Sequence, residues 1–274
     1  MLQDILPHRL DLSYHPSSIG TESRALVFEG EKLLAAAQGG ALGLPRVSDC
    51  SFSGRSVWLF RLDQTDFFLL DPPVRADGYT MLPVSELRRC PVTKEISFAA
   101  MTGYQLYKWY RDNRFCGRCG APLVPACNER ALRCDCCGNV IYPKISPVVI
   151  VGVTDGDRLL MTRYARGEYR NWALVAGFVE VGETPEDAVR REVLEETGIR
   201  IKNPRYVAAQ PWAFSDSLLL GFFAELDGSD KITLQESELS QAAWIPRAEI
   251  RHRPEDFSLT GDLIDRFVRG EMPD

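Results

Sequence analysis

The stretch GFVEVGETPEDAVRREVLEETGI, residues 177–199, decides how the second half of this chain folds. It places seven acidic side chains among 23 residues, with glycines on both sides of a segment that has helical spacing. Thr184 is a good N-cap, Pro185 suits the first helical position, and Gly198 suits the end of a helix. The stretch therefore predicts a helix over residues 185–197 between two glycine-containing turns.

One side of this predicted helix is crowded with carboxylates. At about 100° per residue, Glu192, Glu195 and Glu196 fall within an arc of about 100°. Ala188 and Val189 lie on or beside the same arc, so the acids border the side that packs on a sheet. An acidic helix face is often only a solvated surface, but three like charges at a protein seam are unfavourable unless cations neutralise them. Carboxylates suit Mg²⁺ or Mn²⁺, and these cations hold phosphate oxygens, so the pattern predicts a site for a metal-bound phosphate substrate.

The sequence after residue 143 predicts an α+β sandwich with a mixed sheet. Its strands are expected in SPVVIVGVT, RLLMTRY, WALVAG, LLLGFFAEL and QAAWIP, and a closing helix is expected in GDLIDRFVRGE. Upstream, residues 1–93 show short apolar runs broken by Gly, Pro and Asp, which is typical of a small α+β domain. We therefore expect three parts: an N-terminal domain over 1–93, a helix and a cysteine cluster over 94–143, and the sandwich over 144–274.

Six of the eight cysteines fall within residues 116–137. Four of them form two C-x-x-C pairs separated by 14 residues, Cys116 with Cys119 and Cys134 with Cys137. Four thiolates at this spacing can close a tetrahedral zinc site, and such a site has no open position for a substrate. We therefore predict one structural zinc ion per chain, and we expect the other two cysteines of this segment, Cys127 and Cys136, to be bystanders.

The composition predicts a folded protein without a membrane span. The chain has 274 residues, 45% of them hydrophobic, and a formal net charge of −6, which disfavours wholesale binding to a polyanion. No run of apolar residues reaches the length of a transmembrane helix and no secretion signal stands at the start, so a cytoplasmic location is expected. Residues 108–144 nevertheless carry seven Lys or Arg against three acids, a local excess of positive charge.

The acidic stretch resembles the Nudix box, G-x5-E-x7-R-E-U-x-E-E-x-G-U, where U is aliphatic, and every fixed position of the box is filled. Nudix enzymes hydrolyse a nucleoside diphosphate linked to another group, and their fold is an α/β/α sandwich. The resemblance implies that Glu192, Glu195 and Glu196 bind divalent cations. It also implies that Glu183 supports this site and that Arg191 orients the glutamates by ion pairing.

A second motif lies downstream of the box. Gln210, Pro211, Trp212, Phe214 and Ser217 look like the S-Q-P-W-P-F-P-x-S signature of NADH pyrophosphatases, also known as NAD-cap RNA decapping hydrolases. The segment YPKISPVVIV after the cysteines is similar to another part of this family. The segment ESELSQAAW is similar to a further part, which implies an additional metal-binding or catalytic carboxylate at Glu238. Ala209, Ala213 and Ser215 depart from the signature and put the selectivity for nicotinamide in doubt.

The family resemblance implies hydrolysis of NAD(H) to nicotinamide mononucleotide and AMP, and removal of 5′ NAD caps from RNA. Phe178 and Trp212 are candidates to hold the nicotinamide ring, and RNA is expected to pass Arg114, Arg130 and Arg133. A homodimer is also implied. Two alternatives stay open: a Nudix hydrolase of ADP-ribose or diadenosine polyphosphates, and a zinc-ribbon RNA-binding module with an inactive Nudix scaffold.

Overall fold

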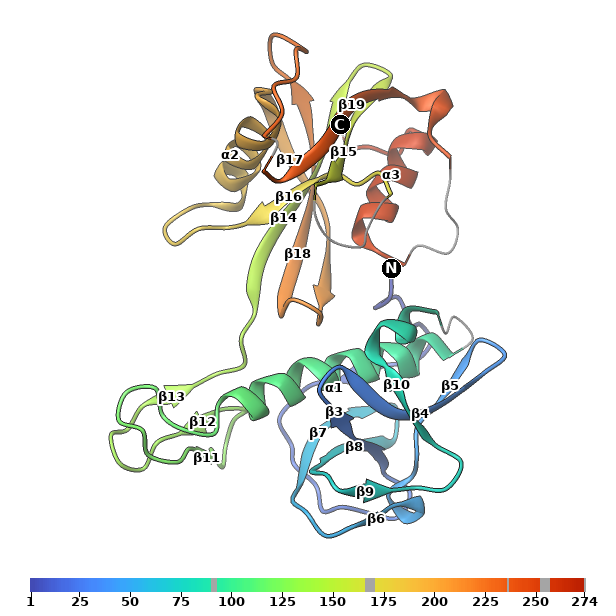
Figure 1. The fold of residues 1–274 in the computed structure, drawn as a ribbon, viewed down its shortest axis with the longest axis vertical. Coiled ribbons are helices and arrows are strands. Elements are labelled where there is room, and N and C mark those ends of the chain that lie inside the picture. Colours follow the sequence, from blue (N-terminus) through green and yellow to red (C-terminus); the bar gives the residue numbers. More distant parts are fainter. Residues whose placement is uncertain (90–92, 166–170, 236, 252–256, 274) are drawn as a thin grey trace. The chain divides into compact units, whose positions relative to one another are not determined.

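A computed structural model describes residues 1–89, 93–165, 171–235, 237–251 and 257–273 of the chain. The chain forms two compact units, one of residues 2–144 and one of residues 145–274 (Figure 1). Within the described residues, no helix combines the length and the apolar character that a bilayer crossing requires. The expected boundary at residue 93 lies inside the first unit and stays a prediction.

Short strands build the beginning of the first unit. One four-stranded sheet has the order β1 (Leu10–Asp11), β7 (Ser56–Leu62), β8 (Thr65–Leu70) and β2 (Arg24–Leu26). A second sheet has the order β10 (Thr80–Pro83), β4 (Lys32–Gln38) and β3 (Phe28–Glu29), with β5 (Ala41–Gly43) also paired to β4. The smaller elements are the β6 (Ser51–Phe52) and β9 (Val74–Arg75) pair and the 3-10 helices η1 (Val47–Asp49) and η2 (Val84–Arg89).

The predicted helix near residue 94 is α1 (Lys94–Asp112), and it packs on these strands. At Gly103 a Cβ atom would lie 2.3 Å from Cδ1 of Leu26, so glycine lets the helix approach β2 closely. The helix leads directly into three short antiparallel strands: β11 (Val124–Pro125), β12 (Leu132–Arg133) and β13 (Val140–Ile141). These strands carry the cysteine pairs on the turns beside them.

The second unit contains a six-stranded mixed sheet (Figure 1). Its order is β17 (Ile201–Trp212), β18 (Ser217–Leu226), β14 (Ser146–Asp155), β15 (Arg158–Tyr164) and β19 (Leu239–Pro246), and β16 (Val175–Phe178) also pairs with β14. Only the β14 and β18 pair is parallel. The remaining elements are α2 (Pro185–Thr197), α3 (Leu259–Arg269) and the 3-10 helix η4 (Arg247–Glu249).

The two helices cover opposite faces of this sheet, because successive strand residues point to opposite sides. Val149 and Val151 of β14 pack in a core with Val189 and Val193 of α2. The alternating residues of β14, including Ile150, pack in a second core with α3. The predicted α+β sandwich with a mixed sheet is therefore confirmed, including the helix over 185–197.

Strand β17 was not expected from the sequence, which has prolines at 204 and 211. It is an edge strand that pairs only with β18, and the register shifts between Lys202 and Arg205 and between Tyr206 and Ala208. Proline is tolerated on an edge strand or at a bulge, because a missing N–H breaks no ladder there. The strand carries Gln210 and Trp212 to one corner of the sheet.

Candidate functional site

Helix α2 brings the acidic side chains of the box to the face of the sheet. Oγ1 of Thr184 accepts a hydrogen bond from the Asp187 N–H at 3.2 Å, and Gly198 ends the helix in the left-handed conformation with φ 71°. Glu192 and Glu196 are only 9% and 3% exposed, whereas Glu195 is exposed. The prediction that the acids border the packing side of the helix is confirmed.

Gly177 on β16 makes room for one of these carboxylates. A Cβ atom at Gly177 would lie 2.0 Å from Cδ of Glu192 and 2.0 Å from its Oε1. Such distances are far below van der Waals contact, so the carboxylate of Glu192 rests where a side chain at position 177 would be. The first glycine of the box is therefore explained by the close approach of Glu192 to the strand.

Arg191 joins three of the box glutamates. Its Nε and Nη2 donate to the two carboxylate oxygens of Glu183, each at 2.8 Å. Its Nη1 donates to Glu192 at 2.7 Å and to Glu195 at 3.2 Å, and its Nη2 also donates to the Phe178 carbonyl at 2.9 Å. Hydrogen bonds from Arg191, and then from the Glu180 N–H, lower the pKa of Glu183 to about 2.

Glu196 lies outside this network. Its Oε2 is buried without a hydrogen-bond partner, and the side chain makes no ion pair with the described residues. Burial, followed by the nearby charges of Glu192, Glu238 and Glu195, raises the pKa of Glu196 to about 8. A buried carboxylate with an orphaned oxygen among like charges fits the donor set of a divalent cation.

Glu238 approaches the same helix from the segment before β19. The Gln235 N–H donates to the carbonyl of Glu196 at 3.0 Å, and the Glu238 N–H donates to the Gln235 carbonyl at 3.1 Å. The carboxylate of Glu238 is exposed, and its charge contributes to raising the pKa of both Glu192 and Glu196. The charges of Glu195 and Glu238 thus act on both buried glutamates, but within the described residues only four cysteines converge as a group of potential metal ligands.

The two candidates for nicotinamide stacking lie on different strands. Phe178 ends β16 and is 52% exposed, and the ring of Trp212 at the end of β17 lies 5.3 Å from that of Phe214. Across the sheet Phe178 pairs with β14, which pairs with β18, which pairs with β17. Three strand spacings correspond to about 14 Å between backbones, so the structure does not bring Phe178 and Trp212 together as neighbours.

Gln210 and Ser217 are turned into the protein. Gln210 is fully buried, its Nε2 donates to the carbonyl of Phe257 at 2.8 Å, and its Oε1 accepts from the Leu259 N–H at 2.7 Å. Its amide thus ties β17 to the start of α3. Oγ of Ser217 is buried and lies 2.9 Å from Oγ of Ser215, which braces the turn that follows Trp212. Nothing in the local sequence indicates the contact between Gln210 and α3.

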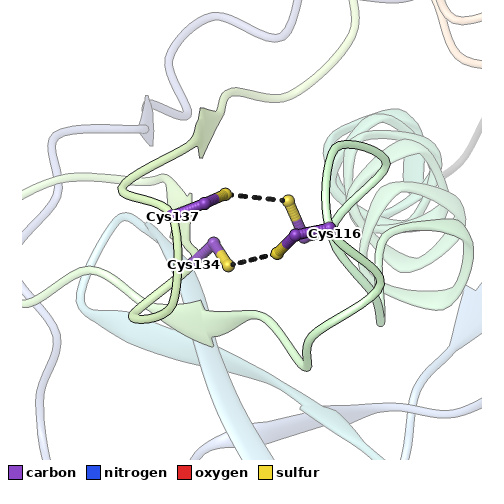
Figure 2. A group of neighbouring side chains, drawn as sticks. Cys116, Cys134 and Cys137 are labelled. Atoms are coloured by element: carbon purple, nitrogen blue, oxygen red, sulfur yellow. Dashed lines mark hydrogen bonds between the residues drawn. The ribbon is translucent and has the colours of Figure 1, made fainter.

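The four cysteines of the two knuckles form a second centre. Their Sγ atoms lie within 4.8 Å of one another, with 3.6 Å between Cys116 and Cys137 and 3.5 Å between Cys119 and Cys134. Figure 2 shows Cys116, Cys134 and Cys137 turned towards a common centre. Zinc–sulfur bonds of about 2.3 Å imply tetrahedron edges of about 3.8 Å, so this cluster fits a structural zinc ion.

Backbone N–H groups favour the thiolate form of two of the four clustered cysteines, one in each knuckle, whereas the pKa values of Cys119 and Cys137 are raised. Donation from the N–H groups of Arg118 and Cys119 lowers the pKa of the Cys116 thiol to about 6. The N–H of Cys137 similarly lowers the pKa of Cys134. Zinc binds the thiolate, so these hydrogen bonds favour zinc binding. Cys127 and Cys136 are exposed and lie outside the cluster.

The three arginines of the expected RNA path differ in their surroundings. The Arg130 guanidinium lies 5.5 Å from the ring of Tyr14 and 5.8 Å from that of Trp58, and it donates to the carbonyl of Leu59. Burial lowers the pKa of Arg130. The guanidinium of Arg130 is therefore engaged within the first unit, and the path past these arginines stays a prediction. Arg133 is exposed but pairs with Asp135 at 2.9 Å, whereas Arg114 makes no ion pair with the described residues.

Two family models match the chain. Residues 144–267 match the NUDIX domain, and residues 111–142 match the NADH pyrophosphatase zinc ribbon domain. The first match contains the acidic helix and the sandwich, and the second contains all four clustered cysteines. The resemblance read from the box and from the cysteine pairs is therefore confirmed.

Curated proteins are similar to part of this chain. The chain is 46% identical to the NAD-capped RNA hydrolase NudC of Citrobacter koseri and to that of Salmonella typhi. Each match extends over 166 residues, which are 61% of this chain and 64% of the relative. A solved NUDIX hydrolase from Nitrosomonas europaea is 24% identical with a TM-score of 0.49, covering 58% of this chain and 94% of its own.

Proposed function

We propose that this chain, which joins an NADH pyrophosphatase zinc ribbon to a Nudix domain, is a divalent-metal-dependent hydrolase of NAD(H) and of NAD-capped RNA. The products are nicotinamide mononucleotide with AMP, or nicotinamide mononucleotide with 5′-monophosphate RNA. The observation that carries this proposal is the buried pair of Glu192 and Glu196 on α2, which a metal–pyrophosphate complex would neutralise. The names of the curated relatives support the choice of substrate.

Four carboxylates are proposed to hold Mg²⁺ or Mn²⁺: Glu192, Glu195, Glu196 and Glu238. Such cations supply charge neutralisation of the pyrophosphate and activation of the attacking water. Arg191 holds Glu192 and Glu195 in position through its Nη1, and Glu183 orients the guanidinium by accepting from its Nε and Nη2. One of the nearby glutamates is proposed to accept a proton from the attacking water.

Ring stacking is proposed for Trp212 and Phe214, which lie against each other at the corner of the sheet. Phe178 is about three strand spacings from β17. We therefore propose that a homodimer completes the site and that Phe178 contacts a dinucleotide bound by both chains. Gln210 and Ser217 are assigned to positioning β17 and its turn, because their polar atoms are engaged within the protein.

The departures from the family signature do not leave the turn after Trp212 unsupported. The hydrogen bond between Ser215 and Ser217 restrains the turn where the signature has a proline. We therefore propose that the protein prefers substrates that contain nicotinamide. ADP-ribose and diadenosine polyphosphates are the alternative substrates. A binding scaffold without catalytic activity is disfavoured. Two buried carboxylates among like charges would destabilise such a scaffold, because no cation would neutralise them.

The remaining proposals concern the partners, the location, the domains and the oligomeric state. NAD(H) and RNA are the proposed partners, and the cytoplasm is the proposed location. We also propose that residues 1–93 form a domain distinct from residues 94–143 and that both belong to the dimer. Light scattering of the purified chain tests the dimer directly. A monomeric mass at micromolar concentration would contradict the proposed dimer.

A product assay tests the proposed reaction. The protein is incubated with NADH, NAD-capped RNA, ADP-ribose or a diadenosine polyphosphate in Mg²⁺ or Mn²⁺, and the products are identified by mass spectrometry. We expect nicotinamide mononucleotide from the first two substrates and a loss of turnover by orders of magnitude in Glu196→Gln. Glu186→Gln is the matched control, because this glutamate is exposed on the first turn of the same helix. Equal turnover of the two variants would refute the metal site.

A further inference from the structure

A cavity of about 660 Å³ lies in the first unit, and its lining includes none of the residues assigned to hydrolysis. It is bordered by the end of α1, the start of the zinc ribbon and the segment after β8. Beside Asp71 and Asn113, its polar and aromatic lining consists of Arg55, Tyr107, Tyr110, Arg111, Arg114 and Phe115. The volume is that of a typical small-molecule site and accommodates a nucleotide.

The lining of this cavity combines buried side chains with exposed arginines. Leu69, Tyr110 and Leu132 are buried. The exposed residues of the lining, here called the rim, include the three arginines. Arg55 pairs with Asp71 and Arg111 with Asp112, but Arg114 has no carboxylate partner within the described residues. Arg114 therefore offers an uncompensated guanidinium, a group that binds phosphate well.

The rim also presents an aromatic ring that the protein leaves uncovered. Phe115 is 62% exposed although its backbone is held firmly. It forms a β-bridge with Pro122, the carbonyl of Arg114 accepts from the Leu123 N–H at 3.0 Å, and the next residue is the zinc-knuckle Cys116. An exposed ring on a hydrogen-bonded backbone, in the lining of the same cavity as an unpaired guanidinium, can stack a base while the guanidinium holds its phosphate.

The polar groups around the cavity do not favour a particular base. Nδ2 of Asn113 donates to the carbonyl of Trp109 at 2.8 Å, and Asp71 is engaged by Arg55. Recognition by stacking and phosphate contact alone is sequence-tolerant.

We propose that this cavity binds a nucleotide of single-stranded RNA, with the base on Phe115 and a phosphate at Arg114. The assignment of RNA as the ligand rests on the proposed function, in which RNA carries the NAD cap. The zinc ion then has a definite task, because the knuckle that begins at Cys116 fixes the position of the stacking ring.

The test measures binding of a short, uncapped, 5′-hydroxyl RNA labelled with fluorescein, using fluorescence anisotropy and the full chain. Phe115→Ala is expected to raise Kd roughly 5- to 150-fold, the range expected for loss of one stacked base. Arg114→Gln is expected to reduce the slope of log Kd against log salt by about 0.7. Both variants should turn over free NADH at the wild-type rate, since neither residue belongs to the hydrolytic site.

Matched controls separate the cavity from general effects of charge and ring loss. Arg75→Gln removes an exposed arginine of the same unit, and Tyr142→Ala removes a ring that is 58% exposed on the same ribbon. RNA affinities of Phe115→Ala and Arg114→Gln that match these controls would overturn the proposal. Displacement of the RNA by AMP at an equal Kd would also overturn it, in favour of a free-nucleotide site. Absence of NADH hydrolysis in the wild type would instead refute the proposed function alone.

Discussion

The glutamates of the acidic stretch, residues 177–199, differ in whether a positive side chain neutralises them. Arg191 donates to Glu183, Glu192 and Glu195, but it makes no contact with Glu196. Three carboxylates are thus held in place before any cation arrives, and the fourth is buried without a counter-charge. The free energy gained when a cation binds is therefore expected to depend most strongly on Glu196.

Gly177→Ala tests the close approach of Glu192 to β16. The new Cβ would occupy the position of the carboxylate, which is the mobile end of its side chain, so the fold should survive while Glu192 moves. We expect weaker Mn²⁺ binding by calorimetry and at least a tenfold loss of NADH turnover. Gly20→Ala is the control, because a Cβ there meets only an ordinary contact at 3.6 Å. Unchanged Mn²⁺ affinity in Gly177→Ala would contradict this account.

Glu196→Gln should stabilise the protein when Mg²⁺ and Mn²⁺ are absent. The pKa of Glu196 is raised from 4.5 to about 8 in the folded state, so the folded protein binds more protons than the unfolded chain between these values. The stability contributed by protonated Glu196 is complete below pH 4.5 and is lost as the pH rises through about 8. Melting curves should show the advantage of the variant growing across this range. An advantage that stays constant with pH would contradict the burial of a charge at this position.

At the scale of elements, the zinc knuckles replace a hydrophobic core in the ribbon. Strands β11, β12 and β13 contain only two residues each, too few to bury much apolar surface. Four thiolates around one metal ion supply the missing stabilisation, as in other small zinc domains.

Cys119→Ser therefore tests the structural role of the metal. We expect elemental analysis to find close to one zinc per wild-type chain and markedly less in the variant, whose melting temperature should fall. Turnover of NADH per folded molecule should change little, because the carboxylates proposed to act in hydrolysis belong to the other unit. Cys127→Ser serves as the control, since Cys127 is exposed and lies outside the cluster. Full zinc content and unchanged melting in Cys119→Ser would show that the cluster does not hold the metal.

Local signals explain which elements could be predicted from the sequence. Helix α2 was predicted with its observed bounds because its cap, its first-turn proline and its terminal glycine all lie within the segment. Strand β17 was missed because its pairing with β18 overrides two prolines. The contact of Gln210 with Phe257 spans 47 residues and that of Arg130 with Leu59 spans 71, so no local pattern could reveal either.

The acidic helix and the zinc cluster lie in separate units of the chain. The unit of residues 145–274 contains the acidic helix, and the unit of residues 2–144 contains the zinc cluster and the cationic cavity. The formal net charge of −6 offers a polyanion no general attraction, so any hold on RNA must come from local groups such as Arg114. Free dinucleotide and capped RNA should consequently respond differently to ionic strength.

We therefore predict that added salt weakens decapping of NAD-capped RNA more steeply than hydrolysis of free NADH. Both substrates present the same pyrophosphate to the carboxylates, so their difference isolates the contacts with the RNA chain. Each phosphate held by a cation should add about 0.7 to the slope of log kcat/KM against log salt for single-stranded RNA. The measurement compares the two slopes at one Mn²⁺ concentration in the wild type and in Arg114→Gln. Parallel slopes in the wild type would mean that the first unit does not hold the RNA, and free dinucleotide would then be the better-supported substrate.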